Sequence, residues 1–327
     1  MVTLQNIRDA QTRIAGRLHR TPVFGSSTLA SRSGAARFEL KCESFQKTGS
    51  FKVRGVLNML SHLSDDARAR GVVTVSAGNH AQALAWGARA AGVRCTVVMP
   101  ANASRTKVEA SLGYGATVIQ HGTSMDAFQR ARELAESEGF TFVHPFDDDR
   151  IIAGTGTVAL EILEQAGVPD VIVIPIGGGG LISGMAIGIK ETNPATRVIG
   201  VEPVGAAVMR QSLDAGRPLR MDAPSSIADG LAAPMAGERN FAAVQRYVDD
   251  VVLVSDEEIA EAMGLLLSRC KLLVEGAGAA ATAALITGKI PMNGTEHVVA
   301  MVSGGNVDLA RLRQVLEKQE QQSIATN

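Results

Sequence analysis

The stretch Val171-Ile172-Val173-Ile174-Pro175-Ile176-Gly177-Gly178-Gly179-Gly180 joins an apolar run to four glycines, and a helical pattern follows over residues 181–191. A continuous apolar run that ends in glycine is typical of a strand buried on both faces of a parallel sheet. Successive glycine N–H groups at a helix start can curl around a phosphate. The alternative is a plain strand-to-helix turn, which would need only one or two glycines. We therefore predict an α/β protein with a phosphate-binding loop.

The same alternation of apolar strands and helices extends outward from this loop in both directions. Strands are expected at residues 38–42, 72–76, 95–99, 117–119, 141–144, 171–176, 197–202 and 297–303. Helices between such strands imply mostly parallel sheets flanked by helices, with ligands bound at the carboxyl ends of the strands. We predict two domains of this kind. Residues 1–60 and 149–327 would form a large cofactor-binding domain, and residues 61–148 a small domain inserted in it.

Composition narrows the class of partner to a small molecule. The 327 residues carry a net charge of −1 and only 4% are aromatic, which favours neither nucleic acid nor an anionic membrane. No apolar stretch reaches the length of a membrane span, and no signal peptide is recognised, so a cytoplasmic location is expected. The cysteines are far apart without a CxxC pair, and we expect buried thiols at Cys42, Cys95 and Cys270.

A lysine at a predicted helix start is the first candidate for chemistry. Lys52 lies in Ser50-Phe51-Lys52-Val53-Arg54-Gly55, near the start of a helix expected over residues 51–63. An apolar neighbourhood beside a helix N-terminus lowers the pKa of an amine, which a Schiff-base lysine needs. The alternative is an ordinary solvated lysine.

Two further segments follow predicted strands. Ser76-Ala77-Gly78-Asn79-His80 opens a helix, so it is a second candidate anion site, although an ordinary helix cap would look the same. Ser303-Gly304-Gly305-Asn306 follows the last strand. A lysine, a phosphate loop and a strand-end serine together suit an aldehyde that carries a phosphate and a ring nitrogen. That molecule is pyridoxal 5'-phosphate.

One segment points to a different class of protein. Gly154-Thr155-Gly156-Thr157-Val158-Ala159 matches a loose dinucleotide fingerprint, which would suit a non-catalytic nucleotide-binding regulator. Residues 147–153 before it do not resemble a strand, so we expect only a closely packed helix start. No HExxH, GxSxG or P-loop pattern is present in the sequence.

The four segments around Lys52, Asn79, Gly177 and Ser303 resemble, in order and spacing, the fold-type II pyridoxal-phosphate enzymes of the threonine/serine dehydratase and serine racemase group. The similarity extends from about residue 7 to residue 316. It implies that Lys52 attaches the cofactor and that the substrate carboxylate binds at Ser76, Ala77, Gly78, Asn79 and His80. The implied cofactor contacts are Phe51, Asn79, Ser303, Gly230 and the glycines Gly177, Gly178, Gly179 and Gly180.

By this resemblance, Phe51 packs on the pyridine ring, Gly230 lies near its other face, and Asn79 bonds the phenolic oxygen. Ser303 faces the ring nitrogen. A hydroxyl does not protonate a pyridine as a carboxylate does, which implies a weak electron sink and prompt loss of a β-hydroxyl. The implied enzyme is a dehydratase that converts an L-β-hydroxy amino acid, such as threonine or serine, to a 2-oxo acid and ammonia.

Two alternatives share these segments. One is a serine racemase, but racemases of this group look to have a serine where this chain has Ala77, and a methyl group carries no proton. The other is a specialised dehydratase of hydroxyectoine or 3-hydroxyaspartate catabolism.

The resemblance also bears on metals and assembly. Relatives that bind a divalent cation use a glutamate, a carbonyl and an aspartate, where this chain has Glu202, Ala206 and Val208. Valine cannot ligate a hard cation, so Glu202 and Ala206 are only possible ligands and no metal site is predicted. A homo-oligomer, dimer or tetramer, is implied. The chain ends before the regulatory domain of biosynthetic threonine dehydratases would begin, so isoleucine feedback is not expected.

Overall fold

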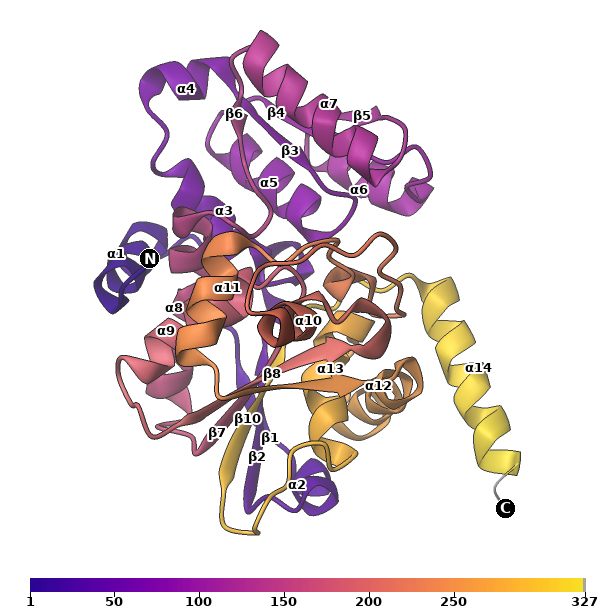
Figure 1. The fold of residues 1–327 in the computed structure, drawn as a ribbon. Coiled ribbons are helices and arrows are strands. Elements are labelled where there is room, and N and C mark those ends of the chain that lie inside the picture. The colour runs from indigo at the N-terminus through magenta and orange to yellow at the C-terminus, as the bar shows by residue number, and fades with distance from the viewer. Residues whose placement is uncertain (326–327) are drawn as a thin grey trace.

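The computed structural model describes residues 1–325, which form two sheets flanked by helices (Figure 1). The six-stranded sheet has the order β1-β2-β10-β7-β8-β9, with β1 (Val23–Gly25), β2 (Arg37–Cys42), β7 (Val171–Pro175), β8 (Arg197–Pro203), β9 (Asp250–Val254) and β10 (His297–Val302). Only β1 runs antiparallel to its neighbour. The four-stranded sheet is parallel, with the order β5 (Thr117–Gln120), β4 (Cys95–Met99), β3 (Val72–Val75), β6 (Thr141–Phe142). The predicted fold class is confirmed.

Both faces of the six-stranded sheet are buried, because successive side chains of its strands point to opposite sides and nearly all are apolar. Val171 and Val173 pack with α2 (Ser27–Ser33), α12 (Asp256–Cys270) and α13 (Gly276–Ile286). Ile172 and Ile174 pack on the other side with α8 (Asp149–Gln165), α9 (Gly180–Lys190) and α11 (Glu238–Tyr247). This alternation explains the uninterrupted apolar run in the sequence.

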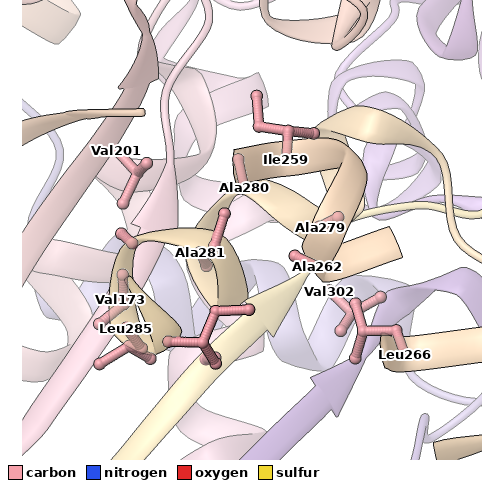
Figure 2. Close-up of a cluster of buried hydrophobic side chains, with 14 of the residues drawn as sticks. Val173, Val201, Ile259, Ala262, Leu266, Ala279, Ala280, Ala281, Leu285 and Val302 are labelled. Atoms are coloured by element: carbon pink, nitrogen blue, oxygen red, sulfur yellow. The ribbon is translucent and has the colours of Figure 1, made fainter. Parts of the chain in front are cut away.

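Helix α13 is buried along its whole length, which its small side chains allow. Figure 2 shows its alanines against the sheet and α12, with Ala279, Ala280, Ala281, Val173, Val201, Val302, Ile259, Ala262 and Leu266 among the labelled residues. Alanine lets helix and sheet approach closely, so the residues just before the helix are held firmly at the strand ends.

The four-stranded sheet is covered in the same way. Helices α3 (Lys52–Leu60) and α5 (Asn79–Ala90) pack with Val72 and Val97, and α7 (Ser124–Ser137) packs with Val73 and Val98. The remaining helices are α1 (Leu4–Ile14), α4 (Asp65–Arg70), α6 (Arg105–Gly113), α10 (Val208–Ala215) and α14 (Leu309–Ala325), with short 3-10 turns η1 (Glu43–Phe45), η2 (Lys47–Gly49), η3 (Val204–Ala206) and η4 (Asp229–Leu231). No helix within residues 1–325 is long and apolar enough to span a membrane.

The alternative interpretation of Gly154 and Gly156 as part of a dinucleotide-binding loop is wrong. Helix α8 begins at Asp149, so both glycines lie in its interior rather than in a strand-to-helix loop. A Cβ at Gly154 would lie 2.6 Å from the Arg54 carbonyl oxygen, and one at Gly156 would lie 2.8 Å from the Gly184 carbonyl oxygen. The two glycines therefore serve close packing, as expected, but from the middle of the helix rather than from its start.

The cysteines are free thiols. Cys42 and Cys95 are buried, and burial raises the pKa of each thiol to about 12, so neither is reactive at neutral pH. Cys270 is only partly buried, which differs from the expectation of three buried thiols.

Candidate active site

The carboxyl ends of β2, β10 and β7 are neighbours, and they bring the predicted segments together. Ser50 and Gly304 form an antiparallel bridge, and the Phe51 N–H donates to the Ser303 carbonyl oxygen at 3.1 Å. The Gly305 N–H donates to the Gly49 carbonyl oxygen at 2.9 Å. The chain around Lys52 is thus fixed to the segment that carries Ser303.

Lys52 is the first residue of α3 and is partly buried. Its Nζ donates to the Pro145 carbonyl oxygen at 3.1 Å and lies 5.0 Å from the centre of the Phe51 ring. Desolvation lowers the pKa of this amine to about 8, while the negative charge of Glu275 opposes the shift. The neutral, nucleophilic form of Lys52 is therefore more accessible than that of a solvated lysine.

Asn79 begins α5, directly after the Gly78 cap. Its Nδ2 donates to Glu275 Oε1 at 2.7 Å, and its Oδ1 accepts from Asn306 Nδ2 at 2.8 Å. Asn306 Nδ2 also donates to the Thr48 carbonyl oxygen at 2.7 Å. Asn79 therefore bonds to residues from two other segments of the chain, and one of these residues, Asn306, bonds in turn to Thr48.

Glu275 was not predicted from the sequence. It is the residue before α13, is 6% exposed, and is the only charged residue between Lys271 and Lys289. Burial raises the pKa of its carboxyl group to about 8, with Asp229 adding to the rise and the hydrogen bond from Asn79 opposing it. The only sequence signal for this residue was a single acidic side chain directly before an apolar helix.

The four glycines that lead into α9 are closely surrounded by other parts of the chain. Gly179 alone has a positive φ, +98°, which favours glycine. A Cβ at Gly178 would lie 2.5 Å from the Phe146 ring, and one at Gly180 would lie 2.9 Å from the Phe146 carbonyl oxygen. A Cβ at Gly177 would lie 3.2 Å from the Gly230 carbonyl oxygen. The freedom in φ expected of this loop thus belongs to Gly179, and the other glycines are needed for space.

A second residue outside the predicted set supports the loop. Asn240 is fully buried on α11, and its Nδ2 donates to the carbonyl oxygens of Gly178 at 3.0 Å and Phe146 at 3.2 Å. One loop carbonyl, that of Gly178, is therefore bound by Asn240, while the N–H groups at the start of α9 form the positive end of a helix.

Ser303 and Gly230 both lie close to Ala277 in the first turn of α13. The Ser303 hydroxyl, 3% exposed, donates to the Ala277 carbonyl oxygen at 3.1 Å. A Cβ at Gly230 would lie 3.1 Å from the Ala277 Cβ, so a side chain there would crowd this turn. Next to Gly230, Asp229 pairs with Lys107 of α6 at 2.5 Å, which joins η4 to the helices of the four-stranded sheet.

The segment from Ser76 to His80 forms the turn between β3 and α5. The Ser76 hydroxyl accepts from the Gly78 N–H at 3.1 Å, and Ala77 packs partly against the apolar core of the four-stranded sheet. His80 is 3% exposed, and neither of its ring nitrogens makes a well-formed hydrogen bond within residues 1–317, although the Val143 backbone is near enough to oppose the fall in its pKa. Burial first, then the charges of Lys52 and His144, lower the pKa of His80, which is therefore a neutral imidazole.

Buried polar atoms test whether the residues suit a polar cofactor. Apart from His80, the hydroxyls of Thr48 and Ser50 beside Lys52 are buried without partners in the described chain, although most buried polar atoms in proteins are paired. Thr48 also has φ +57°, an uncommon conformation for a β-branched residue that is often found at functional sites. Polar donors, a lysine and a closely packed glycine loop fit a phosphorylated aldehyde.

Glu202, one of the two possible metal ligands, lies beside the start of α10. Both carboxylate oxygens of Glu202 accept from the start of α10, from the Met209 N–H at 2.8 Å and the Arg210 N–H at 2.7 Å. Desolvation raises the pKa of this carboxyl group to about 7. Among the side chains that the structure describes, those of residues 1–317, no group of three or more His, Cys, Asp or Glu is arranged to hold a metal.

A parallel sheet whose strand ends bring together a low-pKa lysine, a glycine loop at a helix start and a buried serine defines a cofactor-dependent enzyme of the α/β class. The chain belongs to the family of pyridoxal-phosphate dependent enzymes, whose family model matches residues 14–304. An L-threonine ammonia-lyase from Thermotoga maritima is 43% identical over 319 residues, which cover 97% of this chain and 79% of that protein.

Solved structures agree with this assignment. Maize serine racemase is 38% identical with a TM-score of 0.92, over 98% of this chain and 99% of that one. The processed form of threonine deaminase isoform 2 from Solanum lycopersicum is 36% identical with a TM-score of 0.89, over 96% of this chain and 92% of that one. The predicted resemblance to fold-type II enzymes of the dehydratase and racemase group is confirmed, as is dependence on pyridoxal phosphate.

Proposed function

We propose that this protein is an ammonia-lyase that eliminates the β-hydroxyl of L-threonine, and of L-serine, to give a 2-oxo acid and ammonia. The observation that carries the proposal is the desolvated Lys52 beside the Ser303 and glycine segments, in a chain 43% identical to a protein named L-threonine ammonia-lyase. This relative and an L-threonine dehydratase from Staphylococcus aureus, 42% identical, each cover 97% of the chain, which supports a deaminating lyase over other reactions.

The residues named in the sequence would hold the cofactor. Lys52 would attach its aldehyde, and the loop from Gly177 to Gly180 would bind its phosphate. Asn79 would donate to its phenolic oxygen and Ser303 would face its ring nitrogen, with Phe51 and Gly230 on the two faces of the ring. When bound, pyridoxal phosphate supplies an electron-accepting ring conjugated to the α-carbon of the substrate.

The protein's own groups would direct the proton transfers. The N–H groups at the turn from Ser76 to His80 would bind the substrate carboxylate at the start of α5, where the helix dipole favours an anion. The neutral amine of Lys52 would take the α-proton. Ala77 has no proton to return from the opposite side, which favours elimination over inversion.

Two alternatives share this site. Serine racemase is supported by the structural similarity to the maize enzyme but is opposed by Ala77. A specialised dehydratase of 3-hydroxyaspartate or hydroxyectoine catabolism would use the same residues. Purified protein should therefore be assayed for 2-oxo acid release from L-threonine, L-serine and 3-hydroxy-L-aspartate. The proposal requires the largest kcat/KM for L-threonine or L-serine, and a preference for 3-hydroxyaspartate would contradict it.

We also propose that the two sheets mark two domains with the predicted boundaries, residues 1–60 with 149–327 and residues 61–148. A cytoplasmic homo-oligomer, most simply a homodimer, would suit an amino-acid-degrading enzyme of this family.

A further inference from the structure

We propose that Glu275 and Asn306 are positioning residues that fix the side-chain amide of Asn79, so that one of its N–H groups is left for the cofactor. The inference rests on the proposed function, because it concerns the residue that would contact the phenolic oxygen. Asn79 follows β3 of the four-stranded sheet. Glu275 directly precedes α13, which packs on the six-stranded sheet, and Asn306 follows β10 of that sheet.

The orientation of the three side chains follows from one backbone carbonyl. The Thr48 carbonyl oxygen can only accept, so the Asn306 atom 2.7 Å from it is the amide nitrogen. The same nitrogen lies 2.8 Å from an atom of Asn79, which must then be the oxygen. The nitrogen of Asn79 therefore faces Glu275 Oε1 at 2.7 Å. Neither amide can flip without losing this order.

An asparagine amide has two N–H groups. Glu275 accepts one of these N–H groups, and the other makes no hydrogen bond to the residues whose side chains are described, 1–317. Glu275 is well placed for this, since its Oε1 would meet a Cβ at Gly304 and would lie 4.0 Å from one at Gly230. It therefore lies between two segments assigned to the cofactor, and the remaining N–H of Asn79 is directed by two fixed partners.

The charged groups that face Glu275 are few. Asp229 raises its pKa, whereas Lys107 and Lys52 lower it. The carbonyl oxygen of a neutral carboxyl group and the oxygen of a carboxylate both accept from Asn79, so the positioning role does not depend on which form is present. Glutamine also offers an acceptor oxygen, whereas leucine has a similar size and offers none.

The test is a double-mutant cycle read by cofactor binding. The dissociation constant and visible absorbance spectrum of bound pyridoxal phosphate are measured for the wild type, Glu275→Leu, Asn306→Ala and Asn79→Ala, and for each of the first two changes combined with Asn79→Ala. We expect Glu275→Leu and Asn306→Ala each to weaken binding at least tenfold and to shift the spectrum. When Asn79→Ala is already present, adding Glu275→Leu or Asn306→Ala should change the dissociation constant of pyridoxal phosphate less than twofold, because a positioning residue acts through the residue it positions.

Two further variants separate positioning from a loss of packing. Glu275→Gln should keep binding within about threefold of the wild type because it keeps the acceptor. Asn58→Ala removes a buried amide that donates to the Arg150 carbonyl oxygen at 2.7 Å, so it should lower stability without changing the spectrum. If Glu275→Leu does not fold, Asn306→Ala carries the cycle alone.

If Glu275→Leu and Asn306→Ala weaken cofactor binding equally in the presence of Asn79 and in the Asn79→Ala background, the inference is overturned, while the proposed function stays intact. An unchanged spectrum in both single variants would do the same. A wild type without the visible band of a lysine-linked cofactor would overturn both the inference and the assignment of the site.

Discussion

The guanidinium of Arg54 is held by Glu43 through two hydrogen bonds, from Nε at 2.7 Å and from Nη2 at 2.6 Å. Arg54 is 1% exposed, and its Nη1 also donates to Glu161 at 2.7 Å. Burial alone would lower the pKa of this guanidinium, but Glu43 and Glu161 raise it instead. Because Arg54 lies in the same first turn of α3 as Lys52, this network ties the start of that helix to η1 and α8.

We predict that Arg54→Met lowers the free energy of unfolding by about 3–5 kcal/mol, because it leaves the fully buried carboxylate of Glu43 without its cation, whereas Glu161 keeps its ion pair with Lys41 at 2.6 Å. The surface pair of Arg105 and Glu109 provides the control, and Arg105→Met should cost less than about 1 kcal/mol. Urea unfolding of the cofactor-free protein measures both. If both substitutions lowered the free energy of unfolding by the same small amount, the Arg54 network would contribute little to stability.

Gly179→Ala should weaken the binding of pyridoxal phosphate at least tenfold, about 1.4 kcal/mol. Its φ is +98°, and the added Cβ would lie 2.7 Å from the Asn240 Cβ. Gly167→Ala is the matched control, since Gly167 has φ +79° but no atom within 4 Å of an added Cβ. Loss of cofactor affinity in both variants alike would mean that backbone strain, rather than the loop, is responsible.

The rate at which cofactor-free protein takes up pyridoxal phosphate should rise with pH and level off above about 8. Only the neutral amine of Lys52 attacks the aldehyde, and burial lowers its pKa to about 8 from the ordinary lysine value of 10.5. The carboxylate of Glu275 raises the Lys52 pKa, so Glu275→Gln should move the midpoint lower. Stopped-flow absorbance from neutral to alkaline pH gives the midpoint, and a value near 10.5 would show that Lys52 behaves as a solvated amine.

Ala77→Ser should add measurable racemisation of L-serine while elimination continues, because the new hydroxyl can return a proton to the side opposite Lys52. A tenfold change in the partition needs only about 1.4 kcal/mol of barrier difference. Chiral chromatography of unreacted serine after partial turnover measures it. Abundant D-serine from the unmutated protein would instead favour a racemase.

The strands that are buried on both faces were predictable from the sequence. The expected strand at residues 95–99 matches β4, and that at 171–176 differs from β7 by one residue, because a short, uninterrupted apolar run beside proline or glycine is typical of a buried strand. The edge strands β1 and β9 were missed, since β1 has only three residues and β9 starts at an exposed aspartate. The start of α8 was missed because Gly154 and Gly156 suggested a helix start, and the distances that require glycine there depend on α3 and α9.

The candidate site was predictable only where it is local in sequence. Lys52 and the loop from Gly177 to Gly180 stand out within a few residues of chain. Glu275 meets Asn79 across 196 positions, and Asn240 meets Gly178 across 62, so neither pairing leaves a local pattern. Such residues become visible only when the fold brings the strand ends together.

The most direct test of the central claim is the reaction of L-threonine with the protein loaded with pyridoxal phosphate. We predict release of 2-oxobutanoate and ammonia in equal amounts, and no release from Lys52→Ala, which lacks the amine that takes the α-proton. Turnover of L-threonine that persists in Lys52→Ala, or consumption of L-threonine without a 2-oxo acid, would contradict the proposed ammonia-lyase activity.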